Sequence, residues 1–132
     1  MVRLVAMPNR WSAKTADAGA EEAAVSVRTL AVLLQAGAVP LNAWRHLAES
    51  GDVHAESVVA RCDEGAALVD AIEAERGAWA DVAAAWDVAT TVGAPLAEVL
   101  RSLAETMRDT AAAADDVRIA LAEPAGTARL RA

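Results

Sequence analysis

A phrase that closes one helix and opens the next occurs twice in this chain. The first copy is LLQAGAVPL at Leu33–Leu41, and the second is ATTVGAPL at Ala89–Leu96. Glycine just past a helix end and proline in the first turn of the next helix are typical of tight helix-to-helix corners. In both copies a Leu-Ala-Glu triplet begins ten residues after the glycine, at Leu47 and Leu103. The repeat predicts an all-helical domain built on a duplicated helical hairpin.

Composition agrees with this fold class. Roughly a quarter of the 132 residues are alanine, and phenylalanine and tyrosine are absent. Alanine costs no side-chain entropy in a helix, whereas the β-branched and aromatic residues that favour strands are too scattered to alternate over any window. A chain of this length suits one domain with a real core.

Charge, cysteine content and hydropathy exclude several functions. The net charge is -7 and Lys14 is the only lysine. Binding of nucleic acid is therefore not expected, because it needs clustered basic residues. Cys62 is the only cysteine, which rules out an intrachain disulfide and disfavours a cysteine metal site. The apolar run Met1–Met7 is too short for a signal peptide, and no stretch approaches the ~20 apolar residues of a membrane span, so we expect the chain as given to be soluble.

Breaks in the pattern divide the chain into three parts. Residues 1–19 show no sustained period, and we expect a flexible leader or linker there. Residues 20–123 should form the helical bundle, and residues 124–132 a C-terminal tail. Six helices are expected: about Ala20 to Ala36, Pro40 to the break at Ser50, an Asp52 cap to Asp63, about Leu68 to Gly77, Ala78 to Val92, and Pro95 to about Ala122.

The sixth helix carries a heptad rhythm of apolar positions. Its predicted seam is Leu96, Leu100, Leu103, Met107, Thr110, Ala114, Val117 and Leu121. The seam weakens at Thr110 and Ala114, and about 27 residues make a rod of roughly 40 Å. We therefore predict that the half beyond Met107 is less tightly packed and projects from the bundle. Such a rod would transmit motion toward a membrane or pair with a second copy.

No spacing brings ionisable side chains together as catalysis or metal binding requires. His46 and His54 are separated by a helix break, so they do not form an i, i+4 ligand pair. The carboxylate pairs Asp63-Glu64 and Asp115-Asp116 are interpreted as solvated faces, and the first lacks the EF-hand pattern of a Ca²⁺ site. Cys62 lies on an apolar stripe, which favours a buried structural thiol. We expect no catalytic, cofactor-binding or metal-binding residue, and no enzyme.

The tryptophans and the outer face of the sixth helix are candidates for contacts. Trp44, Trp79 and Trp86 lie on core stripes, and packing is favoured over a ligand pocket. Trp11 lies in the expected leader, and two interpretations of it remain: it contacts a partner or a membrane, or it is simply an exposed residue. The outer helix face is either solvated or a docking surface, and its charges are Glu98, Arg101, Glu105, Arg108, Asp109, Asp115, Asp116 and Arg118. Glu98–Arg101 and Glu105–Arg108 are expected as i, i+3 pairs.

Three stretches carry a resemblance to a known family. The Leu-Leu-x-Ala-Gly-x-x-Pro-Leu corner at 33–41 resembles the opening of the type II secretion system protein F domain, and the stretch 93–104 resembles its second corner. The end of the last helix at 117–124, followed by Ala128-Arg129-Leu130, is similar to the tight-adherence (Flp) pilus assembly branch, especially its alanine-rich actinobacterial members. The resemblance covers about residues 23–130.

The resemblance implies a six-helix cytoplasmic bundle in an inner-membrane platform protein. Such platforms couple a cytoplasmic ATPase to pilin assembly, have no catalytic residues, and contact the ATPase and other platform subunits, with a homo-oligomer left open. The family continues into membrane helices after the region of Ala128–Leu130, so membrane attachment would come through segments absent from this chain, and the nearby arginines fit the positive-inside tendency. A free-standing soluble helical regulator that binds a partner protein remains the alternative.

Overall fold

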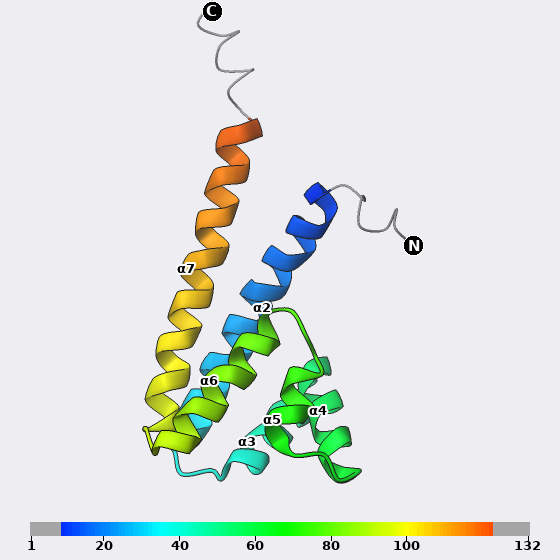
Figure 1. Ribbon diagram of the computed structural model, residues 1–132, viewed down its shortest axis with the longest axis vertical. Coiled ribbons are helices and arrows are strands. Elements are labelled where there is room, and N and C mark those ends of the chain that lie inside the picture. Colours follow the sequence, from blue (N-terminus) through cyan, green and yellow to red (C-terminus); the bar gives the residue numbers. More distant parts are fainter. Residues whose placement is uncertain (1–8, 123–132) are drawn as a thin grey trace, which may run out of the picture.

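The protein is described here by a computed structural model that covers residues 9–122, with side chains described for 19–121. Throughout this part of the chain the regular structure is helical, and the predicted all-α bundle with a long C-terminal helix is confirmed (Figure 1). The helices are α2 (Asn9–Gln35), α3 (Pro40–Glu49), α4 (Val53–Asp63), α5 (Leu68–Glu73), α6 (Ala78–Val92) and α7 (Leu96–Ala122).

The two longest helices form the backbone of the bundle. α2 and α7 lie side by side and run in opposite directions, and α6 packs against both of them (Figure 1). The short helices α3, α4 and α5 contact one another in chain order and make a compact group beside the lower part of α2 and α6. We call these three helices the small-helix group. The upper parts of α2 and α7 extend beyond it.

Both predicted corners are present, and each depends on a glycine with positive φ. Gly37 has φ 105° and Gly93 has φ 77°, a conformation that glycine adopts without the steric cost of a Cβ atom. After Gly37, the Ala38 N–H donates to the Leu33 carbonyl at 3.0 Å, and after Gly93 the Ala94 N–H donates to the Ala89 carbonyl at 2.8 Å. The same corner therefore ends α2 and α6, although the helices that follow differ in length.

A cluster of three tryptophans occupies the core, as predicted. Trp44 of α3 is fully buried, and its ring centroid lies 5.6 Å from that of Trp79 and 5.9 Å from that of Trp86. The tilted arrangements, with interplanar angles of 55° and 45°, suit the quadrupoles of aromatic rings. Both partners lie on α6, so the cluster fastens the small-helix group to α6.

Around this cluster, the predicted faces are confirmed in part. On α6 the predicted stripe of Trp79, Val82, Ala83 and Trp86 is buried throughout. On α4 and α5 only part of each stripe is fully buried, since Val59, Cys62, Leu68 and Val69 remain half-buried. Short helices at the edge of a small bundle have neighbours on one side only, so their outer apolar residues stay partly exposed.

The first helix is longer than predicted. It begins at Asn9 instead of Ala20, so the predicted start of this helix was wrong. Residues 9–19 form a helix although their sequence lacks the apolar periodicity from which the helices were predicted. Residues 1–8, the tail 124–132 and the side chain of Trp11 lie outside the described residues, so the role proposed for Trp11 and the division into leader, bundle and tail stay predictions.

The packed seam of α7 differs from the predicted heptad. Leu100 and Met107 are buried as expected, but Thr110 is exposed and Ala111 is buried in its place. Ala104 is likewise buried, whereas Leu103 is half-buried. The buried seam therefore lies on the neighbouring side of the helix. Small alanine side chains let α7 approach α2 closely, whereas a branched threonine at the contact would keep the two helices further apart.

Candidate functional site

One carboxylate ties α2 to the start of α4 in the small-helix group. Asp52 precedes α4, and its Oδ1 accepts a 2.8 Å hydrogen bond from the Ala55 N–H, which is the predicted N-cap. Its other oxygen, Oδ2, accepts a hydrogen bond from the Ser26 hydroxyl of α2. Ser26 is 9% exposed and lies among apolar neighbours, so this bond satisfies a buried hydroxyl and also fixes the start of α4 against α2.

A second polar cluster joins α4 to the link between α5 and α6. Glu75 has a side chain only 7% exposed and accepts a hydrogen bond from Arg61. His54 Nδ1 lies 2.5 Å from the other carboxylate oxygen of Glu75, so the imidazole donates to it. Arg61 also donates to the Ala71 carbonyl at 3.0 Å. The carboxylate of Glu75 is thus hydrogen-bonded by both Arg61 and His54. A buried carboxylate needs such partners, because burying an unpaired charge is costly.

These polar clusters escaped the sequence analysis for different reasons. Ser26 interrupts the apolar stripe of α2 beside Val27, and a hydroxyl on a core-facing stripe is a signal that a polar partner lies nearby. Arg61 and Glu75 belong to separate elements, and no spacing along the chain relates them. Only the packing of α4 against α5 brings them together.

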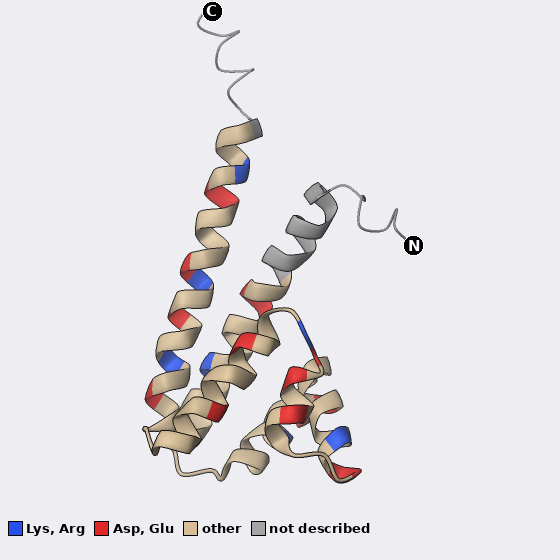
Figure 2. Cartoon of the chain, viewed as in Figure 1, with Lys and Arg blue, Asp and Glu red and all other residues tan. Residues whose placement is uncertain are grey.

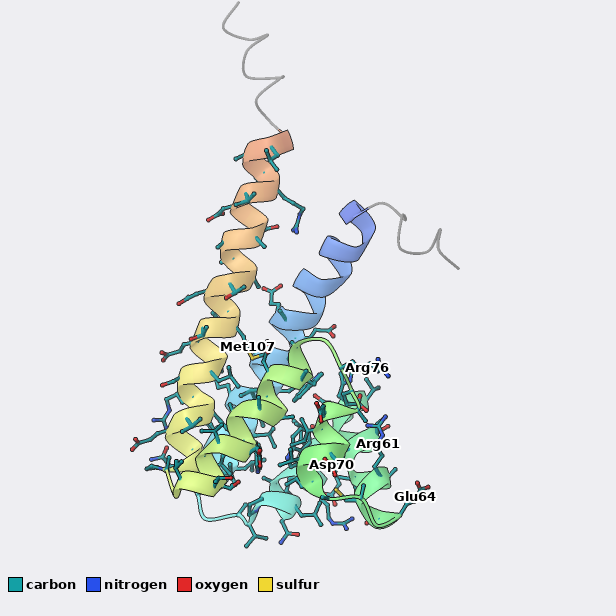
Figure 3. All side chains as sticks on the ribbon, viewed as in Figure 1. Arg61, Glu64, Asp70, Arg76 and Met107 are labelled. Atoms are coloured by element: carbon teal, nitrogen blue, oxygen red, sulfur yellow. The ribbon has the colours of Figure 1, made fainter. Side chains whose placement is uncertain are left out.

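The candidates that the sequence did single out lie apart. His46 is exposed and faces Glu49 at 3.8 Å, while His54 pairs with Glu75, so each histidine has a carboxylate of its own. Asp63 forms an ion pair with Arg45 at 2.7 Å, and Glu64 is exposed next to it (Figure 3). The adjacent carboxylates therefore lie on solvated surface, as predicted.

Cys62 is half-buried rather than fully buried. It packs against the core from the outer side of α4. Burial raises the pKa of the Cys62 thiol, and the negative charge of Asp63 raises this pKa further, while Arg45 opposes the change. Because the thiolate is the reactive form, these influences lower the reactivity of Cys62 relative to that of a free thiol.

The outer face of α7 carries charges of both signs along its length (Figure 2). Arg101 donates to Gln35 of α2, so it bonds across to a neighbouring helix. Arg118 pairs with Asp115 at 2.5 Å. Asp109 and Asp116 are exposed. Among the described residues these charges form separate contacts, and whether the face is only solvated or also a docking surface stays a prediction.

Two apolar grooves are open on the described surface. The first, of about 360 Å³, lies where α2 meets the start of α4 and the start of α6, and we call it the junction groove. Val25 and Ser26 form its α2 wall, Asp52 and His54 its α4 wall, and Trp79 lies at its base. His54 and Trp79 are packed together with ring centroids 5.5 Å apart.

The second groove, of about 380 Å³, runs along the outer side of α6 to the start of α7, and we call it the α6 groove. Val88 and Val92 are 60% and 69% exposed there. No ionisable side chain is among its lining residues, which are Ala84, Ala85, Val88, Ala89, Val92, Ala94 and Val99. Exposed apolar surface of this kind is typical of sites that contact other proteins.

Between residues 9 and 122, no group of three or more histidine, cysteine, aspartate or glutamate side chains is placed to hold a metal ion. Over the same described residues, none of the helices combines the length and apolar character needed to cross a membrane. The described surface is thus that of a helical bundle with two grooves.

Comparison with known proteins identifies the family. Residues 26–130 match the family described as "Type II secretion system (T2SS), protein F", and the chain belongs to this family. The match includes both glycine corners, the tryptophan cluster and all of α7. It confirms the predicted membership of the type II secretion system protein F family, whereas the tight-adherence branch stays a prediction. No curated protein and no solved structure matched the chain. Members of this family are non-enzymatic assembly domains of secretion and pilus platforms associated with the inner membrane.

Proposed function

We propose that this chain is the cytoplasmic domain of an inner-membrane platform protein in a tight-adherence (Flp) pilus machine of the actinobacterial type. In this role it couples a cytoplasmic ATPase to the assembly of pilin subunits and has no catalytic or cofactor-binding residues of its own. The observation that carries the proposal is the family match over residues 26–130, which spans the whole bundle except the first part of α2.

The architecture is suited to passing motion between a partner and a membrane. The tryptophan cluster and the two polar clusters hold the small-helix group rigidly against α2 and α6. α7 extends away from this rigid body, so a displacement of the small-helix group would tilt α7 as a lever. Rigid-body rotation of domains about an interface is one of the common switching movements of protein assemblies.

The proposal is tested first at the level of the gene and then of the complex. We expect the reading frame beyond Ala132 to encode an apolar run of ~20 residues within a short distance. We also expect the purified chain to bind the ATPase encoded beside it, measured by isothermal titration with the ATPase in its nucleotide-bound and nucleotide-free forms.

A matched variant makes the binding test specific. Trp44→Ala should unfold the small-helix group and abolish ATPase binding, whereas Leu121→Ala, at an exposed position, should leave it intact. A stop codon at Ala132, no apolar segment upstream and no ATPase binding would together overturn the proposal. They would instead favour a free-standing helical regulator.

A further inference from the structure

We propose that the junction groove binds the side chain of an arginine presented by a partner protein. The groove is a crevice between three elements, α2, the start of α4 and the start of α6. It combines an aromatic base, two exposed valines and two carboxylates. The inference concerns the partner contacts of the proposed platform role, and it names the chemistry that one of those contacts uses.

The apolar part of the groove fits an aliphatic stem. Val25 of α2 is 58% exposed and Val53 of α4 is 66% exposed, and both line the groove. A long basic side chain buries its methylene groups along apolar surface of this kind while its charged end reaches a polar group. Covering the two valines also removes apolar area from water, which favours binding in proportion to that area.

The polar part of the groove fits a planar cation. Glu22 and Asp52 are carboxylates, and no lysine or arginine is among the residues that line the groove. Asp52 already accepts hydrogen bonds from Ser26 and the Ala55 N–H, so exposed Glu22 is the carboxylate with more capacity for a new donor. Arg76, the basic residue near the start of α6, lines a separate cavity with Asp70 and Glu73.

The aromatic part favours arginine over lysine. The His54 and Trp79 rings pack at a tilt of 42°, and the His54 side chain is 39% exposed, so the His54 ring offers aromatic surface to the groove. A guanidinium group stacks on aromatic faces and is weakly hydrated, whereas an ammonium group holds its water more strongly. A second copy of this chain is a poor occupant, because its net charge of -7 brings further negative charge to the groove.

The test is an NMR titration of the full chain with N-acetyl-arginine-amide. The matched neutral probe is N-acetyl-citrulline-amide, which has nearly the same shape without the charge. We expect saturable shifts, with a millimolar Kd, at the backbone amides of residues 22–26 and 51–54 and at the Trp79 indole. The citrulline probe should give no saturable shift.

Two pairs of variants make the titration decisive. Glu22→Gln should weaken arginine binding about threefold to fivefold, the change expected for one partly exposed ion pair. Glu56→Gln, also exposed but outside the groove, should change it little. Val53→Ala should weaken binding, and Val88→Ala, in the α6 groove, should not.

Each contrary outcome overturns the groove assignment. Shifts spread over all acidic residues, or an unchanged affinity in Glu22→Gln, would mean that arginine associates with the negative surface in general. Groove shifts that depend on protein concentration without any probe would mean that a second copy occupies the site. Because the titration uses no ATPase, its failure would leave the platform role standing, and the ATPase binding test would decide that role separately.

Discussion

The two halves of α7 have the same secondary structure and different surroundings. In the first half, Leu100, Ala104 and Met107 are buried against the bundle, with exposure that rises along the helix from 0% to 6%. In the second half the large apolar residue Leu121 is 76% exposed. Met107 lies near the point where α7 leaves the densest packing (Figure 3).

This contrast separates helix formation from packing. The run Ala111–Ala114 has high intrinsic helix propensity, so local hydrogen bonds continue the helix after the core ends. Tertiary packing, which provides most of the stability of helices in proteins, acts mainly on the first half. A helix that is continuous in shape can therefore be uneven in stability, which suits a lever that joins a rigid body to a moving part.

The largest expected effect is a difference in hydrogen exchange between the two halves. In a monomeric sample, amides at 100–107 should exchange only through global unfolding, and amides at 112–121 through local opening. The protection factors should differ by about 10³ or more, which corresponds to roughly 4 kcal/mol. Equal protection in the two halves would remove the distinction between a packed half and a projecting half.

Truncation of one leucine in each half should show the same contrast in stability. Leu100→Ala empties a fully buried position and should lower the free energy of unfolding by about 2–5 kcal/mol in urea denaturation. Leu121→Ala changes an exposed position and should alter it by less than about 0.5 kcal/mol. A loss above 1 kcal/mol in the second variant would indicate that the distal half is part of the cooperative core.

The corner that begins α7 gives a smaller effect. A branched side chain at Gly93, where φ is 77°, should cost about 1–2 kcal/mol, so Gly93→Val should lower the thermal midpoint. Gly37→Val should do the same at the corner that ends α2. Gly19→Ala is the control, and it should change the stability in the opposite direction. Gly19 lies within α2 with open space around it, so alanine there should stabilise the folded protein by up to about 1 kcal/mol. Unchanged midpoints in both valine variants would remove the assignment of the corners.

The smallest effect is expected at the surface ion pair of the distal half. Asp115→Asn removes the charge that faces Arg118 at 2.5 Å, and an exposed i, i+3 pair contributes a few tenths of a kcal/mol. The free energy of unfolding in urea should therefore change by less than about 0.5 kcal/mol. A loss above 1 kcal/mol would show that this part of α7 is held far more firmly than its exposure indicates.

The helices were predictable to the extent that their signals are local. The Gly-to-Pro corners, the Asp52 cap and the stripe of Trp79, Val82 and Trp86 are fixed by neighbouring residues, and each was confirmed. The prediction was wrong at the start of α2, because residues 9–19 form a helix without an apolar period. It was also wrong at Thr110, because the choice between two adjacent flanks of α7 depends on the surface that α2 presents.

The sequence by itself therefore determined the all-helical class, the two corners, the core-facing position of each tryptophan and the family, because the motifs behind each of these are short and local in the chain. The tertiary structure alone decided which carboxylates meet which bases, as with Glu75, Arg61 and His54. It also decided where grooves open, since a groove exists only between elements that have already packed. The physical reason is that helix periodicity is encoded every three to four residues, whereas the relative placement of helices depends on how all their side chains fit together at once.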